Sequence, residues 1–533
     1  MHVGSFNLCE LPKGFKGSFH NAVTKHMALR MHLAPVFSRK LVFMPLDLGH
    51  PLWVEADSVD VGFHVRRVGP PQASTAPQEG SVKKGETPMT LAAAHKRCAQ
   101  LHSELIDRNF PLWEFHIFDR IQLPKSMGGK IVGGFFSKIH HAALDGKGGV
   151  MLANALLDFT PVPREVAPPD PTRRRKLESD LKLGEMIGSV FSSSLEQLAK
   201  AARLLPSAAS TLGRTVGSTI SSALSNEVIE KAAGSKLRLP VRLAPQTPFN
   251  TGIEAGRVFV TATIPLAECK AMGKAVGGSF NDVVLWICST ALRDYLIRHA
   301  SLPKKSLVAA MPVSLREAGT PDASNLGNQV SMTLVELGTQ LAHPLKRMNA
   351  IMASTAKVKS RVSSLKGFLP TDYPSLLAPW LVGGAARLAL NAVGKTQLIK
   401  RLPMLANLAI SNVPGPPLPL YLAGAKFLSF HPLSIIVHGL ALNITMQSYA
   451  GHVDFGIVAD KKALPHANYL AKAIEAAFKQ ALTVFASPAE GQLPSGKPAD
   501  TRVLKATKKV KLESPPSARW RSAHDTVSVA HND

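Results

Sequence analysis

The chain has 533 residues, enough for roughly two to four domains and a large core. Hydrophobic residues make up 45% and charged residues 19%, which excludes a chain that is disordered throughout. Lys and Arg number 62 against 37 Asp and Glu, so the net charge is +25 and favours a polyanionic partner: nucleic acid, an anionic membrane surface or a phosphate-bearing substrate. Four cysteines without Cys-x-x-Cys spacing exclude a disulfide framework and indicate a reducing compartment.

The N-terminal part predicts short strands and turns, with no signal peptide, because no basic stretch precedes an apolar one. Residues 72–88 are polar and rich in Pro, Gly and Ser, which predicts a surface loop. Apolar residues at helical spacing predict a helix over 89–106. The apolar run 131–139 predicts a strand, which a Gly-rich turn and a short helix over 149–159 should follow.

The middle of the chain predicts a linker over 161–176, closed by the basic cluster Arg173–Lys176. An amphipathic helix over 183–205, ended by Pro206, and a second helix over 212–224 should follow. Strands and helices resume from about 245. The stretch between Lys426 and Asp454 carries no charged side chain, but its His, Asn and Gly residues favour two buried strands over a membrane span.

The sharpest local feature is His140-His141-Ala142-Ala143-Leu144-Asp145-Gly146, at the end of the predicted strand. An imidazole at a strand end is rigid and accessible, and it can take a proton from an alcohol. The alternative is that the two histidines are structural. A metal site is disfavoured, because no His, Cys or Glu cluster elsewhere offers the three protein ligands of a catalytic zinc.

A second feature is Gly278-Ser279-Phe280-Asn281-Asp282, before an apolar helix. Ser279 and Asp282 have the spacing of a capping box. Asn281 would lie in the first helical turn, among free backbone N–H groups, where an oxyanion can be stabilised. The alternative is an ordinary capped helix.

Two further segments stand out. Pro111-Leu112-Trp113-Glu114 predicts a buried aromatic anchor, and Ser411-Asn412-Val413-Pro414-Gly415-Pro416 predicts a rigid turn.

Together and in this order, these motifs resemble the bacterial wax ester synthase/diacylglycerol acyltransferase family of the CoA-dependent acyltransferase superfamily. The resemblance rests on His140-His141-x-x-x-Asp145-Gly146, Pro111-Leu112-Trp113-Glu114 and Asn281-Asp282, and covers roughly residues 1–485. Weaker matches are Pro312-Val313-Ser314-Leu315-Arg316, Gly327-Asn328-Gln329, Ser411–Pro416 and Phe455–Asp460. Family members normally carry an upstream Ser-Pro-x-Asp segment, whereas this sequence starts at the Met-His-Val-Gly stretch, so we expect a truncated or misassigned start.

The resemblance implies an α/β (α+β) fold of two similar CoA-dependent-acyltransferase-like domains, each a mixed sheet flanked by helices. We expect an N-terminal domain over 1–165 and a linker with a helical connector over 166–244. A C-terminal domain over 245–488 and a basic, disordered tail over 489–533 would complete the chain.

The resemblance also implies transfer of a long-chain fatty acyl group from acyl-CoA to diacylglycerol or a long-chain fatty alcohol, without an acyl-enzyme. His141 would be the general base and Asn281 would polarise the acyl carbonyl. His140, Asp145 and Gly146 would support the site, with Arg316 as a partner for Asp145. The substrate-binding residues would be Pro111, Leu112, Trp113 and Asp282.

Acyl-CoA is then a co-substrate, and no cofactor or metal is expected. The positive charge suits the CoA phosphates and a lipid surface, so we expect a cytoplasmic protein associated peripherally with the inner membrane or lipid inclusions. Nucleic acid is disfavoured because aromatic residues are only 6%. Two alternatives remain: another alcohol, amine or sugar acceptor, and an idle site in a lipid-surface-binding protein.

Overall fold

In the computed structural model the chain divides into Met1–Ser487 and Pro488–Asp533, and the fold described is that of the first unit. The structure describes residues 2–43, 51–69, 87–143, 146–169, 243–314, 330–365 and 404–485. Several predicted segments therefore lie wholly or mainly outside the described residues: the loop 72–88, the helices 183–205 and 212–224, the basic cluster Arg173–Lys176 and the tail 489–533.

The elements follow one another in two groups. The first group is β1 (His2–Glu10), α1 (Phe19–Ala28), the 3-10 turns Met31–Leu33 and Pro35–Phe37, β2 (Arg39–Val42), β3 (Leu52–Glu55), α2 (Val61–His64), β4 (Val65–Arg67), β5 (Met89–Thr90), α3 (Leu91–Ser103), β6 (Trp113–Gln122), the 3-10 turn Lys125–Met127, β7 (Ile131–His140), the 3-10 turn His141–Ala143 and α4 (Gly146–Leu156). The second group is β8 (Arg257–Pro265), α7 (Leu266–Ala275), α8 (Phe280–His299), β9 (Val308–Ser314), β10 (Val330–Glu336), α9 (Pro344–Leu365), β11 (Leu408–Val413), β12 (Tyr421–Leu422), β13 (Ala425–Phe427), β14 (His431–Leu433), β15 (Leu442–Tyr449), β16 (His452–Asp460) and α11 (Ala467–Phe485).

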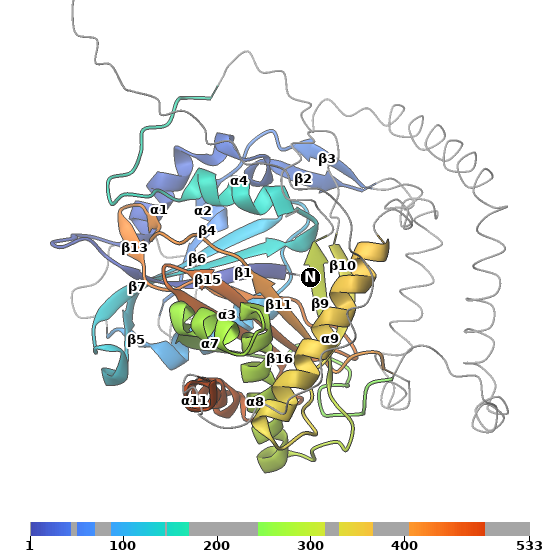
Figure 1. The fold of residues 1–533 in the computed structure, drawn as a ribbon. Coiled ribbons are helices and arrows are strands. Elements are labelled where there is room, and N and C mark those ends of the chain that lie inside the picture. Colours follow the sequence, from blue (N-terminus) through green and yellow to red (C-terminus); the bar gives the residue numbers. More distant parts are fainter. Residues whose placement is uncertain are drawn as a thin grey trace, which may run out of the picture. The chain divides into compact units, whose positions relative to one another are not determined.

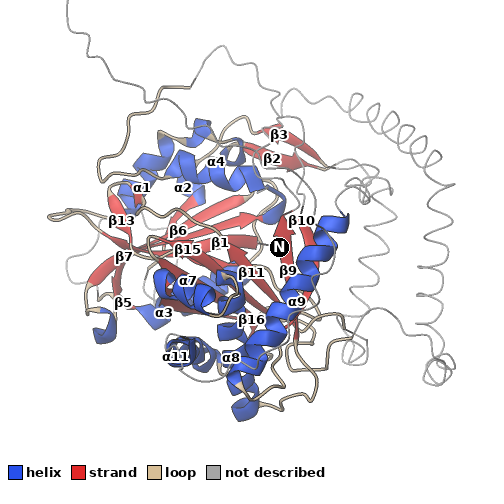
Figure 2. Cartoon of the chain, viewed as in Figure 1, coloured by secondary structure: helices blue, strands red, loops and turns tan. Residues whose placement is uncertain are grey.

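The first sheet combines strands from both ends of the chain (Figure 1). Its order is β12-β13-β1-β7-β6-β4, with β14 also pairing with β1 and β5 with β6. One face packs on apolar side chains of α1 and α4, and Figure 2 shows these helices with α2 on the same side of the strands. The other face packs on α3 and on Phe259 and Val458 of the second sheet.

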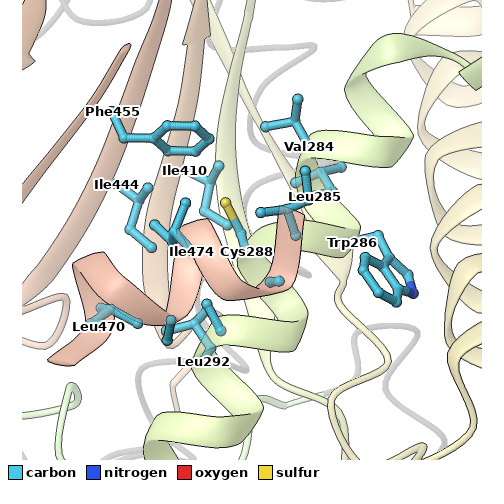
Figure 3. Close-up of a cluster of buried hydrophobic side chains, with 14 of the residues drawn as sticks. Val284, Leu285, Trp286, Cys288, Leu292, Ile410, Ile444, Phe455, Leu470 and Ile474 are labelled. Atoms are coloured by element: carbon cyan, nitrogen blue, oxygen red, sulfur yellow. The ribbon is translucent and has the colours of Figure 1, made fainter. Parts of the chain in front are cut away.

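The second sheet has the order β10-β9-β11-β15-β16-β8 and is mixed, because β11 runs parallel to both β9 and β15. Its core is apolar and is closed by α8 and α11. Figure 3 shows side chains of both helices against the strand residues Ile410, Ile444 and Phe455. The two sheets and their helices confirm the predicted fold class.

Strand β14 joins the two sheets. It pairs with β1 in the first sheet, and Pro432 lies against Gly456 of β16 in the second. A Cβ at position 456 would lie 1.6 Å from the Pro432 carbonyl oxygen, so only glycine allows this approach.

Several predicted elements are confirmed. Helix α3 lies within the predicted 89–106 and β7 covers the predicted 131–139. The uncharged stretch after Lys426 forms β14 and β15.

One prediction is wrong in its boundary. The Gly-rich segment after His141 is not a turn, because α4 begins at Gly146. Glycine in a helix costs only about 1 kcal/mol per residue. Packing of Leu152, Ala155 and Leu156 in the core outweighs that cost.

Within the described ranges, no single helix is long and apolar enough to cross a membrane. The bent pair α7 and α8, which meet at 103°, passes that test together by length and composition alone.

Candidate active site

The site is organised around the end of β7, a central strand of the first sheet. Its last residue, His140, pairs with His2 of β1, and its backbone N–H donates to the Leu112 carbonyl at 2.9 Å. The chain then enters the 3-10 turn His141–Ala143, and α4 starts at Gly146. The two histidines are therefore held by strand pairing on one side and by a helix start on the other.

The ring of His140 supports this turn. Its Nδ1 accepts a hydrogen bond from the Ala142 N–H at 3.2 Å, which leaves the proton of the neutral ring on Nε2. Burial, with a smaller contribution from the Arg108 charge, lowers the pKa of His140 to about 4. This hydrogen bond makes the His140 ring a structural contact within the turn.

The ring of His141 is placed differently. Its side chain is exposed, and within the described part of the chain no residue hydrogen-bonds it. It lies five residues before the first residue of α4, whose N-terminal backbone N–H groups carry partial positive charge. An exposed imidazole on a rigid strand end has the properties of a general base. Asp145, together with the predicted partner Arg316, lies outside the described residues.

The Pro-Leu-Trp segment lies beside this strand end, at the start of the neighbouring strand β6. All three side chains are buried, with Trp113 fully enclosed. Its Nε1–H donates to the Phe37 carbonyl at 3.1 Å, and its ring stacks on His64 with centroids 4.3 Å apart. The structure thus places the three predicted substrate-binding residues in the core, where Leu112 contacts His140 through the backbone.

The Asn-Asp pair opens α8 on the second sheet. Asp282 accepts from the Ser279 N–H at 2.8 Å and its hydroxyl at 2.6 Å, and from the Thr355 hydroxyl at 2.7 Å. The predicted capping box is therefore present, and Asp282 holds the helix start. Asn281 is half-buried in the first turn, and no described residue hydrogen-bonds its amide, which leaves that amide available to a carbonyl oxygen.

The described contacts bring His140 and the Pro-Leu-Trp segment together, and His141 follows His140 in the turn after β7. None of the contacts among the described residues joins His141 directly to Asn281. The two sheets instead meet through α3 and β8, where His95 lies 3.4 Å from the Thr261 hydroxyl.

Sequence reasoning missed a group of buried polar residues beside the histidines. His2 and His102 exchange side-chain-to-backbone hydrogen bonds at 3.3 and 2.9 Å. Next to them, Lys138 and Glu114 form an ion pair of 3.0 Å. The available signal was a Glu and a Lys inside apolar strand runs, since charged residues are almost never buried unless paired.

Among the described residues, no group of three or more His, Cys, Asp or Glu side chains gathers at one point.

Comparison with known proteins decides the family. The Wax ester synthase/diacylglycerol acyltransferase catalytic domain matches residues 1–284, and the WS/DGAT C-terminal domain matches residues 326–481. A Mycobacterium tuberculosis protein named as a diacylglycerol O-acyltransferase is 32% identical over 486 residues, which are 90% of this chain and 95% of that protein. The chain belongs to the wax ester synthase/diacylglycerol acyltransferase family.

Two further similarities agree with this membership. The O-acyltransferase WSD of Acinetobacter baylyi is 29% identical over 478 residues, 89% of this chain and 91% of the relative. The solved structure of a wax ester synthase/diacylglycerol acyltransferase from Marinobacter aquaeolei VT8 shares the fold, with a TM-score of 0.58 and 24% identity over 91% of this chain and 95% of that one. The protein is therefore an acyltransferase, as the motifs predicted.

Proposed function

We propose that this family member transfers a long-chain fatty acyl group from acyl-CoA to diacylglycerol, to a long-chain fatty alcohol, or to both. The observation that carries the proposal is the exposed His141 directly after the end of β7, in a chain whose relatives are named as acyltransferases.

In the proposed reaction, the His141 ring accepts the proton of the acceptor hydroxyl as its oxygen attacks the thioester carbonyl carbon. The resulting oxyanion is stabilised by the Asn281 amide at the N-terminus of α8. The C–S bond then breaks, the proton passes from His141 to the CoA thiolate, and the ester leaves with free CoA. A positioned base supplies about 10²–10⁴-fold, and orientation of the two substrates supplies much of the rest.

The neighbouring residues position these groups. His140 holds the turn through Ala142, and Asp282 holds the start of α8 through Ser279 and Thr355. The Pro-Leu-Trp segment supports the strand end from the core. We place Asp145 as a brace for the loop that leads to α4.

The proposed location is the cytoplasm, at the surface of the inner membrane or of lipid inclusions. Its support is the chemistry of the acceptor, which is an apolar lipid, and the net charge of +25, which suits CoA phosphates and anionic headgroups. Flotation with vesicles of phosphatidylglycerol and phosphatidylcholine tests this. Flotation in 0.1 M but not 1 M salt is expected, and absence of flotation at both would contradict it.

The test of the activity is an acyltransfer assay with palmitoyl-CoA and, in parallel, hexadecanol, a diacylglycerol and hexadecylamine. Wild type and His141→Ala are compared, and products are separated by thin-layer chromatography. Ester formation by wild type that falls about 10²–10⁴-fold in His141→Ala is the expected result. Amide alone would change the acceptor class. If the folded wild type forms no product, the assay is repeated with a protein that starts further upstream. No product from that protein either would favour an idle site in a surface-binding protein.

A further inference from the structure

The buried ion pair behind the histidines is formed by directly opposed residues of two adjacent strands. Glu114 of β6 and Lys138 of β7 are register partners, and the Lys138 Nζ lies 3.0 Å from Glu114 Oε2. Only 1% of Lys138 and 6% of Glu114 are exposed. The pair is therefore almost fully removed from water.

The same carboxylate has two more partners. The His116 Nε2 lies 3.2 Å from Glu114 Oε2, and the Arg66 guanidinium lies 3.5 Å from Oε1. Burial alone would raise the pKa of Glu114, but the His116 hydrogen bond and the cationic neighbours outweigh it and lower that pKa to about 2. The Glu114 carboxylate is thus the shared partner of the Lys138 and Arg66 cations, and its loss would leave both without this negative charge.

The cluster lies close to the proposed base along β7. Lys138 precedes His140 by two residues, so both side chains lie on the same face of β7, and it precedes His141 by three. Glu114 directly follows the Pro-Leu-Trp segment, whose Leu112 carbonyl receives the His140 N–H. The pair therefore links the two strands just before the point where the histidines emerge.

Other charged and titratable groups face this layer from every element packed on it. They are His2 on β1, His102 on α3, Glu104 and Arg108 in the loop after α3, Arg66 on β4, His116 on β6 and Arg257 on β8.

Stability alone is a weak reason for such a pair. Replacing a buried ion pair with apolar residues of similar volume is often neutral or stabilising, whereas removing one partner is strongly destabilising. Buried charges in a protein are also a common way to shift the protonation of a neighbouring functional group.

We propose that Glu114 and Lys138 are positioning residues for acyl transfer: their opposed charges hold the end of β7 in place and set the electrostatic potential at His141. This inference rests on the proposed role of His141 as the base. Loss of Glu114 leaves Lys138 and Arg66 uncompensated, so a protonated ring at position 141 becomes less favourable. Loss of Lys138 has the opposite effect.

The experiment compares Glu114→Gln, Lys138→Met and the double variant by pH profiles of kcat/KM with palmitoyl-CoA and hexadecanol. The acid limb should move to lower pH in Glu114→Gln and to higher pH in Lys138→Met, each by about one pH unit or less for charges roughly 10 Å from the ring. In the double variant it should return close to its wild-type position. If the variants acted only by destabilising the strand, the acid limb would move in the same direction in both single variants. Opposite directions therefore distinguish an electrostatic effect from a loss of stability.

The matched control is the buried pair Arg30–Asp158, with a distance of 3.2 Å and exposures of 2% and 3%. Asp158→Asn should lower the melting temperature and leave the pH profile unchanged. If Glu114→Gln does not fold, Lys138→Met and the double variant still test the direction. The inference is overturned if the acid limb stays in place, or moves in the same direction, in Glu114→Gln and Lys138→Met. Full activity in His141→Ala instead overturns the proposed role of His141 as the base.

Discussion

Two buried regions of this protein, one on each sheet, differ in their side chains. Between the second sheet and helices α8 and α11 the interior is apolar, with Ile444, Phe455 and Leu470 close together (Figure 3). The first sheet instead buries His2, Lys138, Glu114 and His116 on one face, at the end where His140 and His141 emerge. The proposed base and its buried ionic neighbours thus share the first sheet, whereas the apolar cluster around α8 and α11 lies on the second. Polar side chains are buried at the second sheet as well, including Asp454 and Asp460 of β16, but they are not part of that apolar cluster.

The largest expected effect concerns Asn281, which lies in α8 on the second sheet and yet is assigned a role in the reaction. In Asn281→Ala, kcat should fall about 10²–10³-fold with little change in KM for acyl-CoA, since an oxyanion donor acts mainly in the transition state. Steady-state kinetics checks this. The adjacent Asp282→Asn is the comparison: it should lower stability and reduce kcat less than Asn281→Ala, because Asp282 only holds the helix start that carries Asn281. Unchanged kcat in Asn281→Ala would confine the chemistry to the first sheet.

The apolar interior of the second sheet can be tested at Ile444, which is fully buried. Ile444→Ala should reduce the free energy of unfolding by about 2–5 kcal/mol, because it removes buried methyl groups and leaves a cavity. Urea denaturation measures this, with Leu345→Ala as a control at a position that is 50% exposed. Activity per folded molecule should not change. A large loss of kcat in a folded Ile444→Ala protein would show that the core of the second sheet also shapes the site.

His102 of α3, which packs on the first sheet, gives a smaller, pH-dependent effect. Burial is the main cause that lowers the pKa of His102 from 6.5 to about 4. Because the folded state holds this proton less tightly than the unfolded state, the stability that His102 contributes is complete above pH 6.5 and is lost as the pH falls towards 4.

The free energy of unfolding should therefore fall by at most about 1.4 kcal/mol per pH unit for this residue. Urea denaturation at pH 7 and pH 5 checks it against His102→Gln, which keeps a donor for the His2 carbonyl and should show a flatter pH dependence. Identical slopes in both proteins would remove His102 from the explanation.

Much of the local structure was predictable from the sequence because it depends on short spacings. Ser279 and Asp282 are three residues apart and form the capping box, and the apolar period of 89–106 gives α3. The start of α4 was not predictable in the same way. The glycines that follow Asp145 favour a turn locally, and packing of the apolar face of α4 decides otherwise.

The candidate site was predictable in its residue types but not in its roles. His140, His141 and Asn281 were found from their motifs, whereas their environments required the fold. His140 differs from His141 because it accepts a hydrogen bond from the Ala142 N–H. Asp282 differs from Asn281 because it makes the capping contacts of α8. The residues alone predicted Trp113 as a buried aromatic anchor, which its burial confirms, whereas the substrate contact implied by the resemblance stays a prediction.

By itself, the sequence determined the helix caps, the strand that carries the two histidines and the family to which they point, because these depend on residues close together in the chain. Only the tertiary structure decided which distant residues meet. Strands β12, β13 and β14 join the sheet of β1 although more than 400 residues separate them from it. Glu114 meets Lys138 because a register shift between Phe118 and Ile121 sets how β6 pairs with β7. A shift of one residue would send each side chain to the opposite face, and no local pattern specifies that choice.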